Sequence, residues 1–473
     1  MKIDELADFI NGKVVGNNSF FSNQEFTGRF TLLNDAKEGD IVIRHWINGK
    51  GIEIASSKNI ACLITQNPKD GAIETANELN FPLLITDKIE LANAYALKWT
   101  VNKYSPDSTN VVITGTNGKS TTSHLIYHIL NNAGYNAFTN TDSESEFNTL
   151  IDPMVSKLIS DEANAKGKLD FLVIEVSEVQ GWLGNLMKNH ASLMSNALNP
   201  SVGVITNIAM DHIGLVNSID EVFDEISAVP QAIGDGTCVL NYDDELVRKL
   251  DAENPFLWSM NNKSCDLYFD DGIYYNDELI IKKEDLPFTS NHFIQNILSA
   301  VGACISLNID LDLIRDGVKS YRPLNRRFAR LNEEPLIIDD FAHNPDGIKN
   351  TINETVKLLE DGQKLHVVCA IRGSRGVEIN KLNVEALVEV LTDDTTLYLS
   401  SSNDVVNDLN YVTPEERQVF FKLLDENNIS YAHFDNLIDC LSEVYKSADK
   451  KDIILLIGAQ GMDPAESLLE KIL

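Results

Sequence analysis

Short apolar runs alternate with longer segments of helical periodicity along most of this chain. The run Phe171–Ile174 contains no polar residue, and similar runs occur at 111–113, 336–338 and 367–371. Strands buried on both faces of a parallel sheet show continuous runs of this kind, whereas half-exposed strands alternate apolar and polar residues. The pattern therefore predicts parallel sheets that are covered by helices.

The same alternation divides the 473 residues into three regions, because the chain is too long for one compact core. We predict an α/β fold with three domains: a small α/β N-terminal domain (1–107), a central P-loop-type doubly wound parallel sheet (108–323) and a Rossmann-like C-terminal domain (324–473). Strands are expected at 40–43 and 61–65 in the first domain, and the segment 104–108 is its predicted linker.

Composition and charge exclude several classes of protein. The formal net charge of −32 argues against a nucleic-acid partner, because phosphate backbones are bound by clustered cations. Solubility in a salt-rich cytoplasm is the simplest explanation of this acidity. No apolar run approaches the roughly 20 residues of a membrane span, and the first residues lack a signal-peptide layout, so we expect a cytoplasmic protein without a membrane partner. The six scattered cysteines predict reduced structural thiols.

The strongest chemical signal is the segment Val111–Ser120, VVITGTNGKS, which predicts a strand, a glycine turn and the start of a helix. Gly115 and Gly118 would let backbone N–H groups approach an anion, and the helix would direct its positive end toward it. Lys119 adds a charge that can reach terminal phosphates. The segment is therefore a predicted phosphate-binding loop, and an ordinary glycine turn before a helix is the alternative.

The helix that follows this loop begins with hydroxyl side chains, and the loop itself is unusually short. Ser120 or Thr121 can offer a hydroxyl to Mg²⁺. The common P-loop pattern has a glycine five positions before Gly118, where this chain has Ile113. The loop therefore reads G-T-N-G-K-S, with Thr116 and Asn117 between its glycines.

Two predicted strands of the middle region end in side chains that suit a metal ion. Glu175 directly follows the run Phe171–Ile174. A carboxylate at the carboxyl end of a buried parallel strand lies where ligands bind, and it can hold Mg²⁺ against phosphates. The strand expected at 202–206 is followed by Asp211 and His212. The alternatives are a charged residue that only marks the strand end and a structural histidine.

The sequence G-T-N-G-K-S-T-T at 115–122 resembles the ATP loop of the Mur ligase superfamily, the ATP-dependent enzymes that form amide bonds in cell-wall peptides. The resemblance covers nearly the whole chain and is strongest in its middle and last regions. It implies that the loop residues, with Thr116, Asn117 and Lys119 among them, bind ATP. It also implies that Glu175 binds the metal and that His212, in an Asn-x-x-x-Asp-His signature, contacts a second metal ion.

The chain departs from the family at one informative position. Bacterial Mur ligases carry a carbamylated lysine a dozen or more residues after the signature histidine, but no lysine stands between His212 and Val239. We hypothesise that a native carboxylate, Glu225 first and Asp224 or Glu221 next, supplies the missing charge near the second Mg²⁺. A solvated acidic helix face is the alternative explanation.

The resemblance also extends to the adenosine end of ATP. Asn296 matches the last asparagine of a family motif that lies near the adenine. The segment 340–345, DFAHNP, resembles the C-terminal signature of the family, in which Asp340 would hold the ribose and His343 would lie at the nucleotide. Arg327 matches the linker arginine of the family, and its planar fork suits phosphate recognition.

The resemblance implies a reaction, its cofactors and its substrates. The γ-phosphoryl group of ATP would move to a substrate carboxylate, and the amine of an incoming amino acid would attack the acyl phosphate. Arg375, at a place where Mur ligases carry a basic residue, would reach the transferred phosphoryl group when the domains close. We expect ATP and Mg²⁺ as cofactors, a UDP-linked peptide or amino-acid acceptor on the N-terminal domain, a free amino acid, and a monomer. Gly39–Asp40 fits that N-terminal domain and equally fits a structural turn.

The sequence motifs leave several types of Mur ligase open. The missing lysine, the type of first domain and the acidity resemble the archaeal pseudomurein peptide ligases, and so favour pseudomurein biosynthesis. The alternatives are a polyglutamate-type ligase and a non-catalytic or partner-dependent ligase-like subunit of an amidotransferase complex. The residues 400–404 replace the Asp-Asn-Pro-Arg motif that selects diaminopimelate, so the added amino acid is not readable from the sequence.

Overall fold

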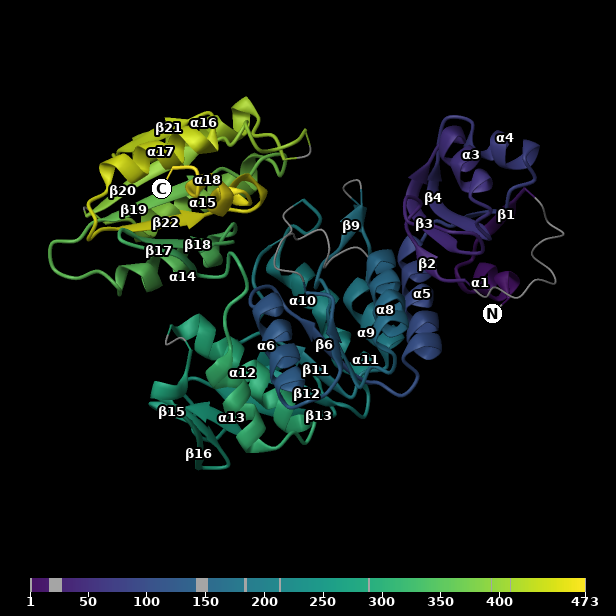
Figure 1. The fold of residues 1–473 in the computed structure, drawn as a ribbon, viewed down its shortest axis with the longest axis horizontal. Helices are drawn as coiled ribbons and strands as arrows, with labels where there is room; N and C mark the ends of the chain where they lie inside the picture. The colour runs from purple at the N-terminus through teal and green to yellow at the C-terminus, as the bar shows by residue number, and fades with distance from the viewer. Residues whose placement is uncertain are drawn as a thin grey trace. The chain divides into compact units, whose positions relative to one another are not determined.

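The computed structural model of the chain describes residues 2–16, 28–141, 152–182, 185–211, 214–287, 290–392, 394–408 and 410–472. These residues form two compact units (Figure 1). The first unit holds nearly all described residues up to Tyr321, and the second holds those from Arg322 onward together with residues 290–292. A five-stranded and a nine-stranded sheet lie in the first unit, and a six-stranded sheet lies in the second.

The five-stranded sheet has the order β1-β5-β4-β3-β2 and is parallel except for β1, which pairs antiparallel with β5. Its strands are β1 (Lys13–Val15), β2 (Phe30–Thr31), β3 (Ile41–Ile47), β4 (Cys62–Pro68) and β5 (Leu83–Ile85). The helices among the described residues of this part are α1 (Ile3–Phe9), α3 (Gly49–Ser57), α4 (Ala72–Glu78) and α5 (Ile89–Tyr104). The strands predicted at 40–43 and 61–65 are thus observed as β3 and β4.

Helix α5 contributes to two hydrophobic cores. One of its faces joins the core of the five-stranded sheet through Ile89, Ala92 and Ala96. The opposite face packs in a core with helices α8 (Asp152–Lys166) and α9 (His190–Leu198) through Ala94, Leu97 and Val101. A helix that is apolar on more than one face is a buried helix, and α5 therefore joins the two sheets of the first unit. The predicted linker is short, because α5 ends at Tyr104 and the next strand begins at Thr109.

The nine-stranded sheet has the order β16-β15-β14-β13-β12-β11-β6-β8-β7. Neighbours from β7 to β14 are parallel, and β15 and β16 extend the sheet with antiparallel pairs. The strands are β6 (Thr109–Thr114), β7 (Ala137–Thr139), β8 (Phe171–Glu175), β11 (Val202–Ile205), β12 (Thr237–Asn241), β13 (Asn254–Ser259), β14 (Leu267–Phe269), β15 (Gly272–Tyr275) and β16 (Glu278–Lys282). A separate pair of strands is formed by β9 (Gly181–Trp182) and β10 (Asn185–Leu186).

Helices cover both faces of this sheet, as a doubly wound fold requires. Val111 and Ile113 of β6 pack on α6 (Lys119–Asn132), α12 (Asn291–Ser306) and α13 (Leu311–Ser320). Val112, which points to the opposite face, packs in the core of α8, α9, α10 (Ile219–Ser227) and α11 (Val229–Ile233). The continuous apolar run in the sequence thus reflects burial on both sides, and the predicted parallel sheet is confirmed.

The second unit is built on a sheet of order β17-β18-β22-β19-β20-β21. Only β17 is antiparallel. Its strands are β17 (Ala329–Glu333), β18 (Leu336–Asp340), β19 (Leu365–Ala370), β20 (Thr395–Ser400), β21 (Tyr431–Phe434) and β22 (Ile453–Ile457). Its helices are α14 (Pro345–Val356), α15 (Val377–Val390), α16 (Pro414–Glu426), α17 (Leu437–Ser447) and α18 (Ala465–Leu469), and hydrophobic cores lie on both faces of the sheet.

The three sheets fall within the three predicted residue ranges, and the α/β fold class is confirmed. The first two sheets share one compact unit, and the exact domain boundaries stay a prediction. All six cysteines are buried thiols, as expected from their scattered positions. Among the described helices, none has the length and apolar character needed to cross a bilayer.

Candidate active site

The predicted phosphate loop connects β6 to α6 at the carboxyl edge of the nine-stranded sheet. Gly115 has a φ of +116° and Gly118 a φ of +85°, a region in which side-chain-bearing residues are strained. A Cβ on Gly115 would lie 2.3 Å from Thr206 Oγ1, and one on Gly118 would lie 2.1 Å from Asn296 Oδ1. Both glycines are therefore required by conformation and by space. Gly118 is also the N-cap of α6, where it brings no side-chain acceptor.

The segment after β11 holds the loop in place. Asn207 Oδ1 accepts a hydrogen bond from the Asn117 N–H at 2.9 Å, and Asn207 Nδ2 donates to the Asn117 carbonyl at 2.8 Å. The Asn207 carbonyl accepts from the Thr116 N–H at 2.9 Å. The Thr116 hydroxyl in turn accepts from the Ala209 N–H at 2.9 Å and donates to the Ala209 carbonyl at 3.1 Å. Asn207, the first residue of the Asn-x-x-x-Asp-His signature, is thus a clamp on the loop that we did not assign from the sequence.

Lys119 lies folded back over the loop. Its Nζ donates to the carbonyls of Gly115 and Thr116 at 2.7 and 3.0 Å, and to Glu178 Oε2 at 2.8 Å. The Lys119 and Glu178 side chains are only 12% and 1% exposed. An unpaired charge at this depth would cost several kcal/mol, so the two residues stabilise each other's charged forms.

Other carboxylates further stabilise the charged form of Lys119. Burial alone lowers the pKa of Lys119, but Glu178, Glu175 and Asp211 outweigh burial and raise that pKa above its ordinary value. We did not predict Glu178 from the sequence. The available signal was a second acid in the turn E-V-S-E, which follows a buried parallel strand and so lies at the ligand-binding edge.

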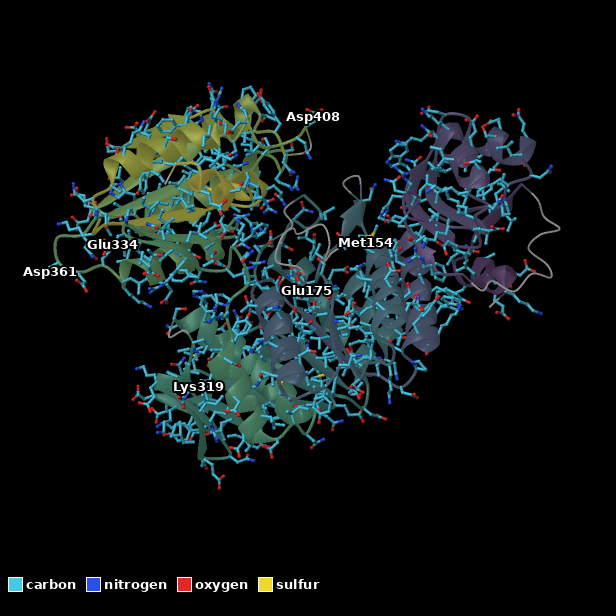
Figure 2. The ribbon with its side chains drawn as sticks, viewed as in Figure 1. Met154, Glu175, Lys319, Glu334, Asp361 and Asp408 are labelled. Carbon is cyan, nitrogen blue, oxygen red and sulfur yellow. The ribbon has the colours of Figure 1, made fainter. Side chains whose placement is uncertain are left out.

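Glu175, labelled in Figure 2, is the last residue of β8. The residue is 5% exposed. It pairs with Ile113 in β6, two residues before the loop begins. Asn140 fixes the Glu175 backbone through hydrogen bonds of 2.8 and 2.9 Å, and the Thr141 hydroxyl donates to Glu175 Oε2 at 3.3 Å. The strand-end carboxylate predicted from the sequence is therefore buried and held beside the loop.

The predicted hydroxyl residues lie in the first turn of α6. Ser120 is half-buried and Thr121 is 6% exposed. The Ser120 carbonyl accepts from the Ser123 hydroxyl at 3.1 Å, and that hydroxyl is hydrogen-bonded to Thr141. Thr141 also contacts Glu175, so a chain of hydroxyl groups connects the first turn of α6 to the buried carboxylate.

Glu225 is the one buried member of the three acids proposed to replace the carbamate. Its side chain is 5% exposed, whereas Asp224 and Glu221 are exposed. Glu225 Oε2 accepts from the Asn189 N–H, at the start of α9, at 2.6 Å. Burial raises the pKa of Glu225, and the nearby amide of Asn189 and the charges of His190 and Lys188 oppose that rise. A solvated acidic face does not describe Glu225, whose observed contact stabilises the start of α9.

Of the predicted metal ligands, the structure describes Ser120, Glu175 and Glu225. His212 lies outside the described residues. Within the described ranges, no three or more His, Cys, Asp or Glu side chains form a group that could hold a metal ion. Mg²⁺ is usually held by one or two carboxylates, with water and phosphate oxygens completing its shell. Glu175 and the Ser120 hydroxyl are oxygen donors of the kind that such a site needs.

In the second unit, Asp340 ends strand β18 as predicted. Its Oδ2 accepts from the Phe328 N–H at 2.8 Å, and its Oδ1 accepts from the Ala342 N–H at 2.9 Å and from the Thr351 hydroxyl at 3.1 Å. A carboxylate has about four lone-pair positions, so these three donors fix its orientation without saturating it. The turn after β18 is thus built around the residue expected to hold the ribose.

The two neighbouring arginines have different surroundings. Arg326 is 8% exposed and forms ion pairs with Asp339 at 3.2 Å and with Asp463. Burial raises the pKa of Asp339 to about 6, although Arg326 opposes this rise. Arg327, the predicted phosphate-binding arginine, lies with its guanidinium 5.1 Å from the ring centre of Phe341. The Arg326 guanidinium also lies 5.0 Å from the ring centre of Phe341, so the two arginines share this aromatic residue and differ in the buried ion pairs of Arg326.

The rest of that motif forms the corner between β18 and α14. His343 is half-buried, with Nδ1 2.7 Å from the Phe341 carbonyl. Its own carbonyl accepts from Asn383 Nδ2 at 2.9 Å. Asn344 caps α14, because its Oδ1 accepts from the Gly347 N–H at 2.8 Å. Arg375 is exposed in the loop between β19 and α15, a segment of the same unit.

Comparisons with known proteins agree with this geometry. The Mur ligase middle domain matches residues 113–304, and the Mur ligase, glutamate ligase domain matches residues 326–460. A UDP-N-acetylmuramate--L-alanine ligase from Caldicellulosiruptor bescii is 26% identical over 384 residues, which cover 77% of each chain. MurF from Acinetobacter baumannii has a similar fold, with a TM-score of 0.71 at 16% identity over 100% of this chain and 98% of that one. A pseudomurein peptide ligase type C from Methanothermus fervidus gives a TM-score of 0.60 at 19% identity. The match covers 92% of this chain and 95% of that chain.

A parallel α/β sheet with a glycine loop at its carboxyl edge, followed by a second α/β unit, is typical of nucleotide-dependent enzymes. The chain belongs to the Mur ligase superfamily of ATP-dependent, amide-bond-forming ligases. The family inferred from G-T-N-G-K-S is confirmed.

Proposed function

We propose that this protein joins an amino acid to a UDP-linked peptide or amino-acid acceptor through an acyl phosphate. The observation that carries the proposal is the Lys119 ammonium group, held in a glycine loop beside buried Glu175 and Glu178. An acceptor carboxylate oxygen attacks the γ-phosphorus, the bond from that phosphorus to ADP breaks, and ADP leaves. The amine nitrogen then attacks the acyl carbon, phosphate leaves, and the nitrogen releases a proton.

The residues of the first unit have distinct roles in this proposal. The N–H groups at the start of α6 would bind the phosphates, because the glycine N-cap brings no side-chain acceptor of its own, whereas the N–H groups of Thr116 and Asn117 donate to Asn207. Lys119 exchanges part of its contact with Glu178 and the loop carbonyls for phosphate oxygens. Glu175 and Ser120 would hold Mg²⁺, which when bound offsets the charge on the phosphates. We retain His212 as a further metal ligand from the family signature.

The residues of the second unit and of α12 serve the remainder of the nucleotide. Asp340 would accept ribose hydroxyls, with His343 in the same turn. Asn296 would lie at the adenine, as the family motif implies. Arg327 and Arg375 would bind phosphate or the developing phosphoryl anion.

The acceptor would bind on the five-stranded sheet, where Trp46 stands near the carboxyl end of β3. The Arg44 guanidinium lies 5.2 Å from the centre of the Trp46 ring, and Lys69 Nζ lies 5.6 Å from it. An aromatic face flanked by two cations suits a nucleobase with its attached diphosphate. Asp40 does not belong to this surface, because its carboxylate accepts from Arg29 and from the Lys37 N–H at 2.8 Å. We therefore interpret the Gly39–Asp40 pair as a structural turn.

We further infer that the acceptor belongs to pseudomurein biosynthesis. No lysine occurs between His212 and Val239, and the acid at the corresponding helix, Glu225, is buried. The fold is also similar to that of a pseudomurein peptide ligase type C. A site that uses a native carboxylate would not depend on carbamylation by CO₂.

The test is ADP release from the purified chain with each of the twenty amino acids and ornithine, against UDP-linked peptide acceptors and a folylpolyglutamate acceptor. We expect release that requires both one amino acid and a UDP-linked acceptor. Release with the folate acceptor alone would support the polyglutamate-type alternative. Release that appears only after addition of a second protein would support the amidotransferase-subunit alternative. Turnover that falls when CO₂ is removed would contradict the native-carboxylate site.

A further inference from the structure

The loop between β19 and α15 is organised around a carboxylate from a different helix. Glu416, in the first turn of α16, is 2% exposed. Its Oε1 accepts from the N–H groups of Arg375 at 2.9 Å and Gly376 at 2.7 Å. Its Oε2 accepts from the N–H groups of Ser374 at 3.1 Å and Thr413 at 2.9 Å. One buried side chain thus binds three consecutive amides of the loop.

The conformation of the loop explains how these amides converge. Ser374 has a φ of +56° and Gly376 a φ of +94°. Left-handed residues in a short loop turn successive N–H groups toward one point, which forms an anion-binding nest. In this protein the anion in the nest is the side chain of Glu416.

Helix capping alone does not account for these contacts. Thr413 and Glu416 form a capping box, in which the Thr413 hydroxyl accepts from the Glu416 N–H at 3.2 Å and Glu416 accepts from the Thr413 N–H. That box uses only one of the four hydrogen bonds to the carboxylate. The other three go to residues 374–376, about forty positions earlier in the chain.

The opposite side of the loop is fixed as well. Asn380, which is fully buried in α15, donates from Nδ2 to the carbonyls of Arg372 at 2.8 Å and Gly376 at 3.1 Å. A Cβ on Gly373 would lie 2.2 Å from the Asn410 carbonyl, so the backbone of the segment before α16 presses directly on the loop. The backbone is held from two sides, while the Arg375 side chain is exposed.

We propose that Glu416 is a positioning residue for Arg375. Because the Glu416 carboxylate occupies the amides of residues 374–376, those amides do not serve as donors to a substrate anion. The loop acts on the reaction through the Arg375 guanidinium, and Glu416 sets the backbone from which that side chain projects. The inference rests on the proposed ligase function and on the role given to Arg375 there.

The test compares Glu416→Gln with Thr413→Ala. Glutamine keeps the shape of the side chain but directs its NH₂ group at N–H donors, so it cannot accept all four hydrogen bonds. In Glu416→Gln we expect faster hydrogen exchange at the amides of residues 374–376 and a fall in kcat of at least tenfold, with the Kd for ATP unchanged. Thr413→Ala removes the α16 cap without removing the loop contacts, so it should lower the Tm while it keeps the exchange pattern and kcat.

A double-mutant cycle with Arg375→Ala separates positioning from general support of the fold. If Glu416 acts through Arg375, Glu416→Gln reduces kcat less than twofold in the Arg375→Ala background. Losses that multiply independently would overturn the inference, and so would unchanged exchange at residues 374–376. Should Glu416→Gln not fold, Glu416→Asp, which keeps the charge on a shorter side chain, is expected to give a partial loss of both protection and kcat.

The outcomes distinguish this inference from the ligase assignment. Wild-type activity in Arg375→Ala would overturn the positioning role and leave the ligase assignment intact, since that assignment depends on Lys119. A wild-type chain without amino-acid-dependent ADP release would overturn the proposed function. In that case the exchange experiment still decides whether the Glu416 carboxylate holds the loop.

Discussion

Two loops of this protein occupy equivalent places in different sheets and have opposite chemistry. Residues 115–118 follow strand β6 and lead into α6, and residues 373–376 follow β19 and lead into α15. Both begin and end with glycine, and both carry a basic residue at or next to the start of the helix. In the first loop a buried acid, Glu178, binds the basic side chain. In the second loop a buried acid, Glu416, binds the backbone amides.

In our proposals, this difference gives each loop a different role. Where the internal acid binds Lys119, two loop amides donate to Asn207, and it is the start of α6 that is suited to an external phosphate. Where the internal acid fills the amides, only the arginine side chain is presented. Glycine-rich loops between strand and helix are therefore not interchangeable as evidence of phosphate binding. We propose that the position of the partner carboxylate decides which groups of each loop are available to a ligand.

The largest effect is expected from Lys119→Ala. Loss of this donor should raise the activation barrier by about 3 kcal/mol or more, by analogy with the loss of single transition-state donors. The rate of ADP formation should then fall roughly a hundredfold or more. The variant should also unfold more easily, because Glu178 would be left buried without its partner. ADP release and urea denaturation measure the two effects. Adding Glu178→Gln should restore stability but not turnover, and near-normal ADP formation in Lys119→Ala would remove the loop from the active site.

The buried Arg326–Asp339 ion pair of the second unit gives a prediction about pH. The pKa of Asp339 is raised from 3.8 to about 6, so protonated Asp339 favours the folded state. Its contribution to stability is complete below the unfolded pKa near 4 and is lost as the pH rises through 6. Relative to Asp339→Asn, the wild-type free energy of unfolding should therefore fall between pH 4 and 7, by up to about 3 kcal/mol for two pKa units. Urea titrations of both proteins across that range measure the difference, and parallel pH profiles would contradict it.

The glycines of the two loops give a matched pair of substitutions. Gly376→Ala meets no atom within 4 Å, but its φ of +94° and ψ of +167° lie in a region nearly confined to glycine, so it should cost about 1–3 kcal/mol of stability from backbone strain alone. Gly118→Ala adds the clash with Asn296, and should cost about 2 kcal/mol and weaken ATP binding roughly tenfold. Calorimetric titration with ATP tests this difference. Asn296→Ala in the Gly118→Ala background should recover part of the stability, and equal ATP affinities in the two single variants would argue against the steric explanation.

The smallest effect is expected outside both loops, at Lys69. Lys69→Ala should raise the KM for the UDP-linked acceptor about three- to fivefold with little change in kcat, in line with about 1 kcal/mol for an exposed cation over an aromatic ring. The effect should shrink at high salt. Lys98→Ala, at an exposed position on α5, changes the charge equally and is the control. An equal rise in KM for both variants would indicate a general charge effect.

The sequence was sufficient for features that are local in the chain. A few neighbouring residues were enough to predict the strand before Gly115 and the glycine turn. The same holds for the acid directly after the run Phe171–Ile174. The partners that complete the site come from elsewhere: Asn207 clamps the loop from another strand, and Glu416 reaches back about forty residues. No local pattern distinguishes such an acid from the many others in a chain with 71 of them. Their roles depend on strand order, which the spacing of elements does not determine.

Helix α5 has a consequence for how the chain could be divided. Its two apolar faces belong to different cores, one around the β3–β4 strands and one around α8 and α9. A fragment that stopped at residue 107 would bring Ala94, Leu97 and Val101 into water. The opening hundred residues are therefore not a portable module, and grafting them onto another ligase to change its acceptor would require carrying α8 and α9 along with them.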